Sequence, residues 1–289
     1  MTRYGQWLET LQWSTTGLRT PGAKQVVRRW LQPFVKLAFR PTLDGLDHLP
    51  QDRPFLLVAN HSAGVALAEL SSLSVLWTTH VDDRIPIAGF AHPVGFRFAP
   101  GRWLHRHVGS VPSTKQAALD ALADGVSLLV FPGGDYECLR PFWQSNTVDF
   151  GGRVGFLRIA RETGVPIVPL GIRGSHWTVP FMFGRSGWLS QVLVTPRLLG
   201  VKRWGFTAFG LLGAAALSQL PVHPLARIVI VWAWLGSPFI FLPVVPMTLR
   251  FRVGAPLSPD ALFGTDGNRP LADALADVEA AIQRLVRRE

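Results

Sequence analysis

The chain has 289 residues, of which 48% are hydrophobic, so it can bury a sizeable core, and global disorder is excluded. Its net charge of +10 suits an anionic partner, which means nucleic acid, an anionic membrane surface or a phosphate-bearing substrate. The single cysteine, Cys138, excludes an intrachain disulfide and a metal site built on several thiolates, and it fits a reducing compartment.

The first 40 residues mix tryptophans with arginines. Residues 25–40 place apolar side chains at helical spacing with basic ones among them, and Pro33 should bend this helix. Since Trp beside Arg favours a bilayer interface, we expect residues 1–40 to form amphipathic, membrane-associating helices. The alternative is a helix that packs on the domain with its charges in water. No apolar core with a cleavage site marks a secretory signal.

From residue 41 onward, strand-like and helix-like segments alternate. Strands are predicted at 41–50, 54–59, 86–90, 126–131, 165–172 and 248–253. Helices are predicted at 69–79, from a capping box at 113–116 to Gly125, at about 153–163 and at 268–289. This alternation predicts a single α/β domain over residues 41–289, with a central, largely parallel mixed sheet flanked by helices. Ligands gather at the C-terminal ends of the strands in such sheets.

Residues 204–246 form an apolar region near the C-terminus. Residues 205–220 and 228–247 carry no charge, and each is close to the ~20 apolar residues that span a bilayer. Prolines such as Pro221 and Pro238 interrupt both segments. We therefore expect membrane-facing helices that lie in the interface or line an acyl-chain groove. A transmembrane span is the alternative.

Four sequence blocks carry the candidate chemistry. The first is Asn60-His61-Ser62, where the strand at 54–59 delivers an imidazole among small residues. The others are VGSVP at 108–112, FPGGDYECLRP at 131–141 and GVPIVPL at 164–170. Histidine is the side chain best suited to accept a proton near neutral pH. His61 taken alone would more often be a structural histidine at the end of a strand.

In order and spacing, the four blocks resemble those of the glycerolipid acyltransferase superfamily, the lysophosphatidate-acyltransferase-like enzymes, over roughly residues 40–260. That family has an Asn-His block, a Gly-containing block, a Phe-Pro-Glu-Gly block and a Val-Pro-Ile-Val-Pro block. The resemblance implies a membrane-associated enzyme that transfers a fatty acyl group from acyl-CoA or an acyl-carrier protein to the hydroxyl of a lipid or alcohol. No cofactor or metal is implied.

The departures from the family pattern bear on the acceptor. The family usually has an aspartate five positions after the histidine, where this chain has Ala66. Gly133 and Tyr136 stand where the family usually has the Glu and Arg associated with binding glycerol phosphate. The block looks more like the branch of diacylglycerol acyltransferases and related bacterial proteins, which implies a neutral alcohol acceptor. A lysophospholipid or glycerol 3-phosphate acceptor, as in phospholipid biosynthesis, is the alternative.

The resemblance implies that His61 is the general base that takes the proton of the acceptor hydroxyl. A carboxylate should hold the imidazole in the correct tautomer. Glu69, the nearest acid downstream of His61, is the first candidate and Asp135 the second. Glu69 as a solvated helix residue is the alternative.

Further residues are expected to bind substrate. Asn60 and Ser62 flank His61 and should line the site. The backbone N–H groups of Gly133 and Gly134 are candidates for binding the oxyanion or an acceptor oxygen, although a tight turn would also favour glycine. We expect Glu137 and Arg140 to position the acceptor, and Arg153 to meet phosphates of the donor, unless Arg153 belongs to a solvated basic face.

Two other function classes compete with an enzyme. A non-catalytic lipid-binding relative is suggested by Ala66 at the usual acid position. A nucleic-acid binder is suggested by charge alone, and we do not expect one, because no binding motif occurs and the basic segments are interleaved with apolar ones. The expected location is the cytoplasmic face of the inner (plasma) membrane.

Overall fold

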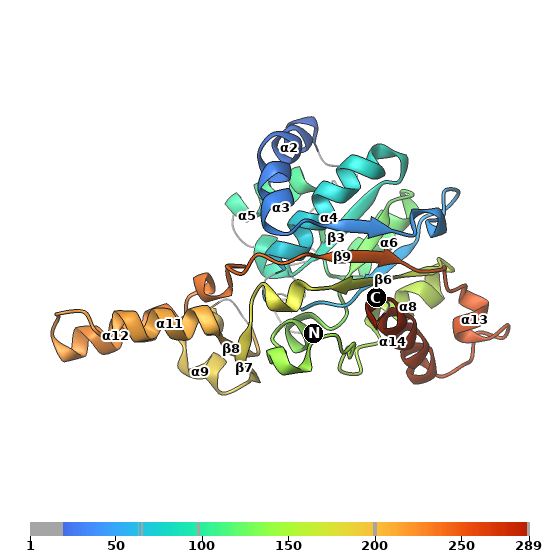
Figure 1. Cartoon of the computed structure of the whole chain (residues 1–289). Coiled ribbons are helices and arrows are strands. Elements are labelled where there is room, and N and C mark those ends of the chain that lie inside the picture. Colours follow the sequence, from blue (N-terminus) through green and yellow to red (C-terminus); the bar gives the residue numbers. More distant parts are fainter. Residues whose placement is uncertain (1–19, 63, 65, 97–98, 199–200, 288–289) are drawn as a thin grey trace.

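The computed structural model describes residues 20–287 except 63, 65, 97–98 and 199–200 (Figure 1). About half of the predicted N-terminal segment, residues 1–19, lies outside the described residues. At the centre is a seven-stranded sheet of order β1-β9-β6-β2-β5-β3-β4. All neighbours are parallel except β6 and β9, which are antiparallel. The prediction of a single α/β domain with a largely parallel mixed sheet is confirmed.

The elements have the following bounds. The strands of the large sheet are β1 Thr42–Asp44, β2 Leu56–Ala59, β3 Ile87–Ala91, β4 Ser110–Pro112, β5 Ser127–Val130, β6 Ile167–Arg173 and β9 Arg250–Val253. The α-helices are α2 Pro21–Val26, α3 Gln32–Ala38, α4 Leu67–His80, α5 Ala99–Val108, α6 Lys115–Ala123, α7 Gly134–Cys138, α8 Gly155–Thr163, α9 Leu189–Val192, α10 Val194–Leu198, α11 Ala208–Leu217, α12 Pro224–Leu235, α13 Pro259–Phe263 and α14 Leu271–Arg287. Short 3₁₀ turns are η2 Leu46–His48, η3 Asp82–Arg84, η4 Pro93–Phe96, η5 Phe142–Gln144, η6 Ser175–Trp177 and η7 Pro238–Phe241.

Helices cover both faces of the sheet (Figure 1). Successive side chains of a strand point to opposite faces, so Leu56 and Val58 of β2 join a core cluster with α6, α8 and α14. Leu57 and Ala59 join a second cluster with α3 and α4. All four residues of β2 are buried, which explains why the strand reads as a continuous apolar run. The sheet thereby fixes the position of whatever follows Ala59.

The helix after the second block is capped by a different residue from the one that the sequence suggested. We expected a capping box over residues 113–116. Thr114 is the N-cap of α6, and its hydroxyl accepts a hydrogen bond from the backbone N–H of Ala117 at 3.3 Å. Gln116 instead donates to the Asp120 carboxylate at 2.7 Å, so the reciprocal half of a capping box is not formed.

The described part of the N-terminal segment is a bent helix. Between α2 and α3 lies a π-helical stretch, η1 Val27–Leu31, just before Pro33. A proline lacks an N–H, and its ring crowds the carbonyl four residues earlier, which explains the widened turn. Lys24 and Arg28 pair with Asp82 at 3.2 and 3.1 Å. One face of the segment therefore packs on the domain, as in the alternative above, while its other face leaves apolar side chains exposed.

A second sheet was not predicted. Strands β7 Phe181–Ser186 and β8 Trp204–Thr207 pair antiparallel with irregular register and belong to a third apolar cluster. Helices α11 and α12 follow β8 and extend away from the large sheet (Figure 1). In the described part of the chain, no helix combines the length and apolar character needed to cross a bilayer.

Candidate active site

The loop after β2 presents His61 at the C-terminal edge of the sheet. Asn60 anchors the start of this loop, because its side-chain amide donates to the carbonyl of Ile172 at 2.8 Å and accepts from the N–H of the same residue at 2.7 Å. Ile172 lies on β6, the parallel neighbour of β2. Asn60 is therefore a buried clamp between two strand ends, rather than a residue that lines a substrate site as we had expected.

A carboxylate holds the His61 ring. Nδ1 of His61 lies 2.6 Å from Oε2 of Glu69, and Oε1 of Glu69 accepts the backbone N–H of Ser62 at 3.0 Å. Glu69 is fully buried, and His61 is only 8% exposed. The structure thus brings together the two residues that the sequence ranked first as base and orienting acid, and Glu69 is not a solvated helix residue.

The conformation of position 66 makes this pairing possible. Ala66 stands where the family usually has an aspartate, and it adopts a left-handed backbone conformation with φ +63°. Helix α4 begins only after it, so Glu69 lies in the first turn of α4, and its side chain reaches back to His61. The N-terminus of a helix also favours a negative charge. Glu69 supplies the carboxylate that residue 66 lacks.

The surroundings of His61 favour its protonated form. Burial lowers the pKa of His61, but the Glu69 carboxylate and the neighbouring Cys138 thiol raise it more, so the net pKa lies well above the ordinary 6.5. With Nδ1 facing Glu69, the neutral ring carries its proton on Nδ1, and Nε2 is the nitrogen that can accept one. The ring also packs on Phe131 with centroids 5.0 Å apart.

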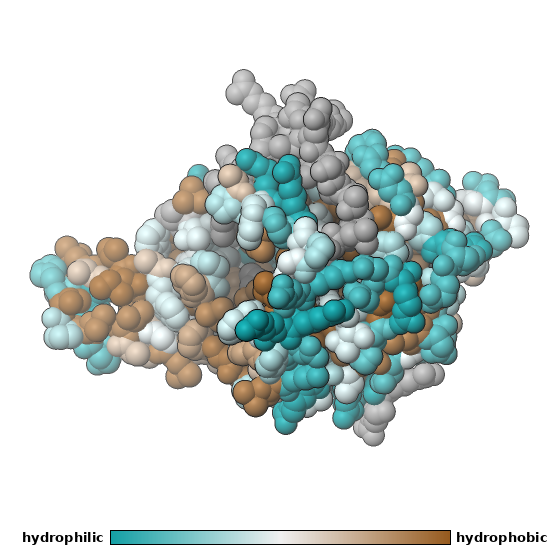
Figure 2. All heavy atoms as spheres, turned by 90° about the horizontal axis from the view of Figure 1, so that it is seen from above, coloured by the Kyte–Doolittle hydropathy of each residue, from teal (hydrophilic) through white to brown (hydrophobic). Residues whose placement is uncertain are grey.

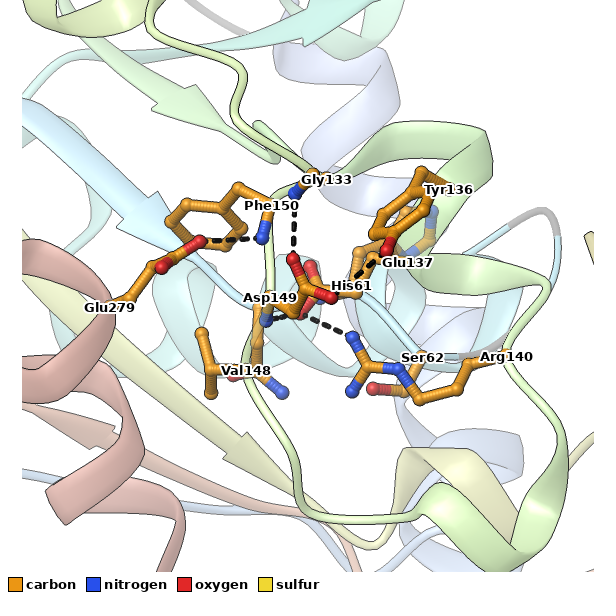
Figure 3. A network of polar contacts seen from close by, with 12 residues as sticks. His61, Ser62, Gly133, Tyr136, Glu137, Arg140, Val148, Asp149, Phe150 and Glu279 are labelled. Atoms are coloured by element: carbon orange, nitrogen blue, oxygen red, sulfur yellow. Dashed lines mark hydrogen bonds and ion pairs between the residues drawn. The ribbon is translucent and has the colours of Figure 1, made fainter. Parts of the chain in front are cut away.

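The side chains of Glu137 and Arg140 point toward each other next to His61 (Figure 3). Oε2 of Glu137 accepts the backbone N–H of His61 at 2.9 Å, while Oε1 accepts from Arg140 Nη2 at 3.3 Å and from the backbone N–H of Asp149 at 3.4 Å. Both side chains are buried to 1% exposure or less. Burial raises the pKa of Glu137 to about 8, against the lowering effects of Arg140 and the His61 N–H. We had expected this pair to position the acceptor, but the contacts observed are to the backbone of the loop.

Gly133 leaves room for the Glu137 carboxylate. A Cβ at position 133 would lie 2.5 Å from Oε2 of Glu137. The family usually has its glutamate at this position, so here a carboxylate from one helical turn further along fills the space. The N–H of Gly134, which we had expected to meet an oxyanion, donates to the carbonyl of Phe131 at 3.2 Å within the turn.

Gly133→Ala should therefore lower the free energy of unfolding by about 1–3 kcal/mol, the usual cost of overpacking. The added methyl would displace the Glu137 carboxylate and, with it, the His61 backbone. Urea unfolding measures the loss, and Gly155→Ala, where a Cβ meets nothing within 4 Å and φ, as at Gly133, is not positive, is the matched control. Equal losses in both variants would mean that crowding against Glu137 does not account for the effect.

Asp135, the second candidate for the orienting acid, lies in a different cluster. It forms ion pairs with Arg153 and with Arg203, the latter at 3.2 Å. Burial acts to raise the pKa of Asp135, but the two arginines outweigh burial and lower it. Arg153 also donates to the carbonyl of Gly133 at 2.6 Å, so it braces the Gly-Gly turn. Glu69, and not Asp135, is thus the carboxylate that contacts His61.

Sequence reasoning missed the cationic surroundings of Tyr136. The guanidinium of Arg185 lies 4.0 Å from the centre of the Tyr136 ring, and that of Arg203 lies 5.4 Å away. The Tyr136 hydroxyl donates to Asp149 at 3.0 Å. Arg185 belongs to β7 and Arg203 directly precedes β8, so the unpredicted small sheet supplies both. No motif marks these arginines. They cluster around the position at which the family usually has an arginine of its own.

Several buried polar atoms near the site lack hydrogen-bond partners within the described part of the chain. These atoms are Nε and Nη1 of Arg140, Oγ of Ser175 and Nδ1 of His176. The other ring nitrogen of His176 lies 3.0 Å from the carbonyl of Pro141. Native proteins rarely leave such groups without water or another partner. Among the described residues, no three His, Cys, Asp or Glu side chains are grouped so that they could hold a metal ion.

Comparison with known proteins finds an acyltransferase family model and several relatives that are similar to this chain. The family model "Acyltransferase" matches residues 40–173, which include His61, Glu69, the Gly133-Gly134 turn and β6. An uncharacterized protein of Mycobacterium tuberculosis is 32% identical over 203 residues, which is 68% of this chain and 53% of that protein. Phytyl ester synthase 2, chloroplastic, of Arabidopsis thaliana is 26% identical over 136 residues, which is 45% of this chain and 19% of that protein.

A solved structure shares the fold. The 1-acyl-sn-glycerophosphate (LPA) acyltransferase PlsC of Thermotoga maritima has a TM-score of 0.50 and 19% identity, with 99% of this chain and 90% of that chain covered. The chain spans about half the length of the mycobacterial relatives that it matches. Residues 40–173, which hold His61 and Glu69, match the acyltransferase family model, so this part of the chain is similar to the glycerolipid acyltransferase superfamily.

Proposed function

We propose that this chain is an O-acyltransferase that moves a fatty acyl group from a thioester donor to the hydroxyl of a neutral lipid or alcohol. The observation that carries the proposal is the 2.6 Å contact between His61 and Glu69 at the C-terminal end of β2. In this arrangement Nδ1 of a buried imidazole contacts a carboxylate, and Nε2 does not contact that carboxylate. A general base has the same arrangement. The match to the acyltransferase family model spans residues 40–173, which include this pair, and supports the proposal.

The proposed reaction needs no cofactor. Nε2 of His61 takes the proton of the acceptor hydroxyl while the hydroxyl oxygen bonds to the thioester carbonyl carbon. The carbon–sulfur bond then breaks, and the imidazolium returns the proton to the leaving thiolate. The products are one ester and one free thiol. Glu69 stabilises the imidazolium between the two proton transfers.

The same pair argues against a non-catalytic lipid-binding relative. That alternative was motivated by the absence of an aspartate at position 66. Because Glu69 contacts His61 from the first turn of α4, the carboxylate is present in space although it is displaced in sequence. A protein that only binds lipid has no need for a buried, carboxylate-held imidazole.

A neutral acceptor is favoured by the third block. Tyr136 stands where the family usually has the arginine associated with glycerol phosphate, and two relatives bear names that describe the synthesis of phytyl esters. Against this, Arg185 and Arg203 stack around Tyr136 and provide positive charge from another part of the fold. A lysophospholipid or glycerol 3-phosphate acceptor, with a role in phospholipid synthesis, is thus the second candidate.

The acceptor class is tested by acyl transfer from radiolabelled acyl-CoA and acyl-carrier protein to a panel of long-chain alcohols, diacylglycerol, lysophospholipid and glycerol 3-phosphate. We expect turnover with a neutral alcohol. Turnover confined to the phosphate-bearing acceptors would overturn the neutral assignment. Absence of transfer from any donor to any acceptor would favour the lipid-binding relative.

The donor, the membrane and the location are also part of the proposal. Acyl-CoA and acyl-carrier protein both carry phosphates, and Arg153 and Arg203, each about one-third exposed, are the basic residues at the Gly-Gly turn to meet them. Lipid substrates require contact with a membrane surface. The buried free thiol of Cys138 suits a reducing compartment, so we propose the cytoplasmic face of the inner membrane.

The pH dependence of the reaction should report on His61. The base must be neutral, and its pKa is raised, so kcat/KM should rise with pH through an apparent pKa above 6.5. Glu69→Gln removes the carboxylate that raises this pKa, so the rise should move to lower pH. The maximal rate should fall about 10²- to 10⁴-fold, because the amide can hold the wrong tautomer. If the rise of kcat/KM with pH in Glu69→Gln occurred at the same pH as in the wild type, a group other than His61 would be the one that titrates.

A further inference from the structure

Helices α11 and α12 form an apolar hairpin that extends away from the rest of the molecule, and we refer to residues 208–235 as the arm (Figure 1). None of the twelve residues of α12 is buried, and Gly210 is the only buried residue of α11. The outward stripe of α12 consists of Leu225, Ile228, Val229 and Trp232, at the spacing of one helix face. A helix on a water-exposed surface normally has polar residues there.

The arm is a formed element and not a loose segment. The indole N–H of Trp234 on α12 donates to the carbonyl of Gly210 on α11 at 2.8 Å. A Cβ at Gly213 would lie 2.6 Å from the same ring, so the two glycines permit the close approach of the helices. Thr207 caps α11 by accepting the N–H of Gly210 at 2.9 Å. The outward apolar stripe therefore keeps its shape without a partner.

The charge of the sequence stretch that contains the arm indicates the kind of partner. Between Glu162 and Asp260 the sequence contains no Asp or Glu. The same stretch holds eight basic residues: Arg173, Arg185, Arg197, Lys202, Arg203, Arg227, Arg250 and Arg252. Seen from above, the arm is mostly hydrophobic, with hydrophilic residues at its tip (Figure 2). An apolar stripe with Trp and Arg and without acidic residues fits the interface of an anionic lipid bilayer.

The lengths of the helices determine how the arm would be oriented relative to the membrane. At ~1.5 Å per residue, α12 is about 18 Å long, little more than half of the ~30 Å hydrocarbon core. The polar tip includes His223 and Arg227, which prefer headgroups to hydrocarbon. Both features favour an arm that lies along the surface of one leaflet rather than one that enters tip first.

We propose that the arm docks this protein on anionic membranes by lying in the interface with its Leu225–Trp232 stripe in the lipid. The proposal rests on the acyltransferase function, since the lipid acceptors and long acyl chains that the enzyme would use reside in the bilayer. The position of the arm in the fold is consistent with delivery of lipid to the His61 loop. Phe241, in the η7 turn after the arm, packs so closely that a Cβ on Gly64, three residues after His61, would lie 3.2 Å from it.

The test is flotation with vesicles of phosphatidylcholine, with and without phosphatidylglycerol. The arm variant is Leu225→Gln/Ile228→Gln/Val229→Gln. The matched variant is Trp30→Gln/Phe34→Gln/Leu37→Gln, which removes three exposed apolar side chains from the N-terminal helices. We expect the wild-type protein to bind the anionic vesicles and the arm variant to lose roughly 100-fold in partitioning. The matched variant should stay within a few-fold of wild type.

Three outcomes would overturn the proposal: no vesicle binding by the wild type, equal binding by the arm variant, or a loss confined to the matched variant. A wild-type dimer that the arm changes convert to a monomer, without vesicle binding, would assign the stripe to contacts between copies. Acyl transfer in detergent with a short-chain thioester separates this proposal from the enzymatic one. The arm variant should keep that turnover, whereas vesicle binding by a protein that has no turnover would leave the docking proposal standing and refute the enzymatic one.

Discussion

His61→Ala should lower kcat for acyl transfer by about 10³-fold, within the range of 10² to 10⁴ typical of a general base. The reason is that Glu69 holds Nδ1 of His61 at 2.6 Å, which leaves Nε2 as the atom that accepts the proton. Among the contacts of the described residues, no other imidazole contacts the Glu69 carboxylate. KM should change little, because the ring is mostly buried and offers little surface for binding either substrate. Steady-state kinetics with acyl-CoA and the preferred alcohol measure both constants.

His80→Ala is the matched control, since this histidine is exposed at the end of the same helix that supplies Glu69. Its kcat should equal that of the wild type. Because His61 is buried, far-ultraviolet circular dichroism must show that the His61→Ala protein is folded, and His61→Asn provides a variant of closer shape. Turnover within a few-fold of wild type in both folded variants would assign proton transfer to another group.

Above pH 8, where Glu137 is ionised, Arg140→Met should lower the free energy of unfolding by about 3–5 kcal/mol, the usual cost of removing one partner from a buried ion pair. Glu137 would then remain fully buried without its cation. The Glu137 carboxylate also holds the His61 backbone N–H, so acyl transfer should fall as well. Urea unfolding followed by circular dichroism measures the stability. Arg158→Met, an exposed arginine on α8, should change it by less than about 0.5 kcal/mol.

The loss should depend on pH in a defined direction. The pKa of Glu137 is about 8 in the folded protein and 4.5 ordinarily, so the folded state binds this proton more tightly than the unfolded state. The stabilisation from this group is therefore complete below pH 4.5 and is lost as pH rises toward 8. Removing Arg140 raises the pKa of Glu137 further, which makes the destabilisation larger at pH 8 than at pH 5. The double variant Glu137→Gln/Arg140→Met should flatten this dependence, and a steep slope that persists would place the titration elsewhere.

The exchange of carboxylates between positions explains two departures of this chain from the family pattern. The family's usual aspartate at position 66 is replaced by Glu69, and the usual glutamate at position 133 has its place filled by Glu137. In each case the acid lies three or four residues further along the chain, and its side chain points back to the His61 loop. The positions of the acids in the sequence change, but one carboxylate still contacts the His61 ring and another still accepts the His61 backbone N–H.

The sequence by itself determined six of the seven strands of the central sheet and the order of the four blocks, whereas β4 was not predicted. The apolar runs at 54–59, 126–131 and 165–172 are buried on both faces, and no other element type fits runs so short and continuous. Parallel strands have their C-terminal ends at one edge, so the position of His61 at that edge also followed from the sequence. The pairing of His61 with Glu69 was ranked first because Glu69 is the nearest acid downstream of His61 in the sequence.

Only the tertiary structure decided which polar groups meet. Whether Glu69 or Asp135 contacts His61 depended on the left-handed backbone conformation of Ala66. An alanine in the sequence does not predict this conformation, because alanine rarely adopts it. Asp135 and Arg203 are 68 residues apart, and their contact exists because β7 and β8 fold back over the Gly-Gly turn. The sequence predicted apolar, membrane-facing helices within residues 204–246, but it did not predict that α11 and α12 form a hairpin that extends away from the sheet. Local sequence specifies backbone periodicity, whereas pairing and burial are set by residues that are distant along the chain.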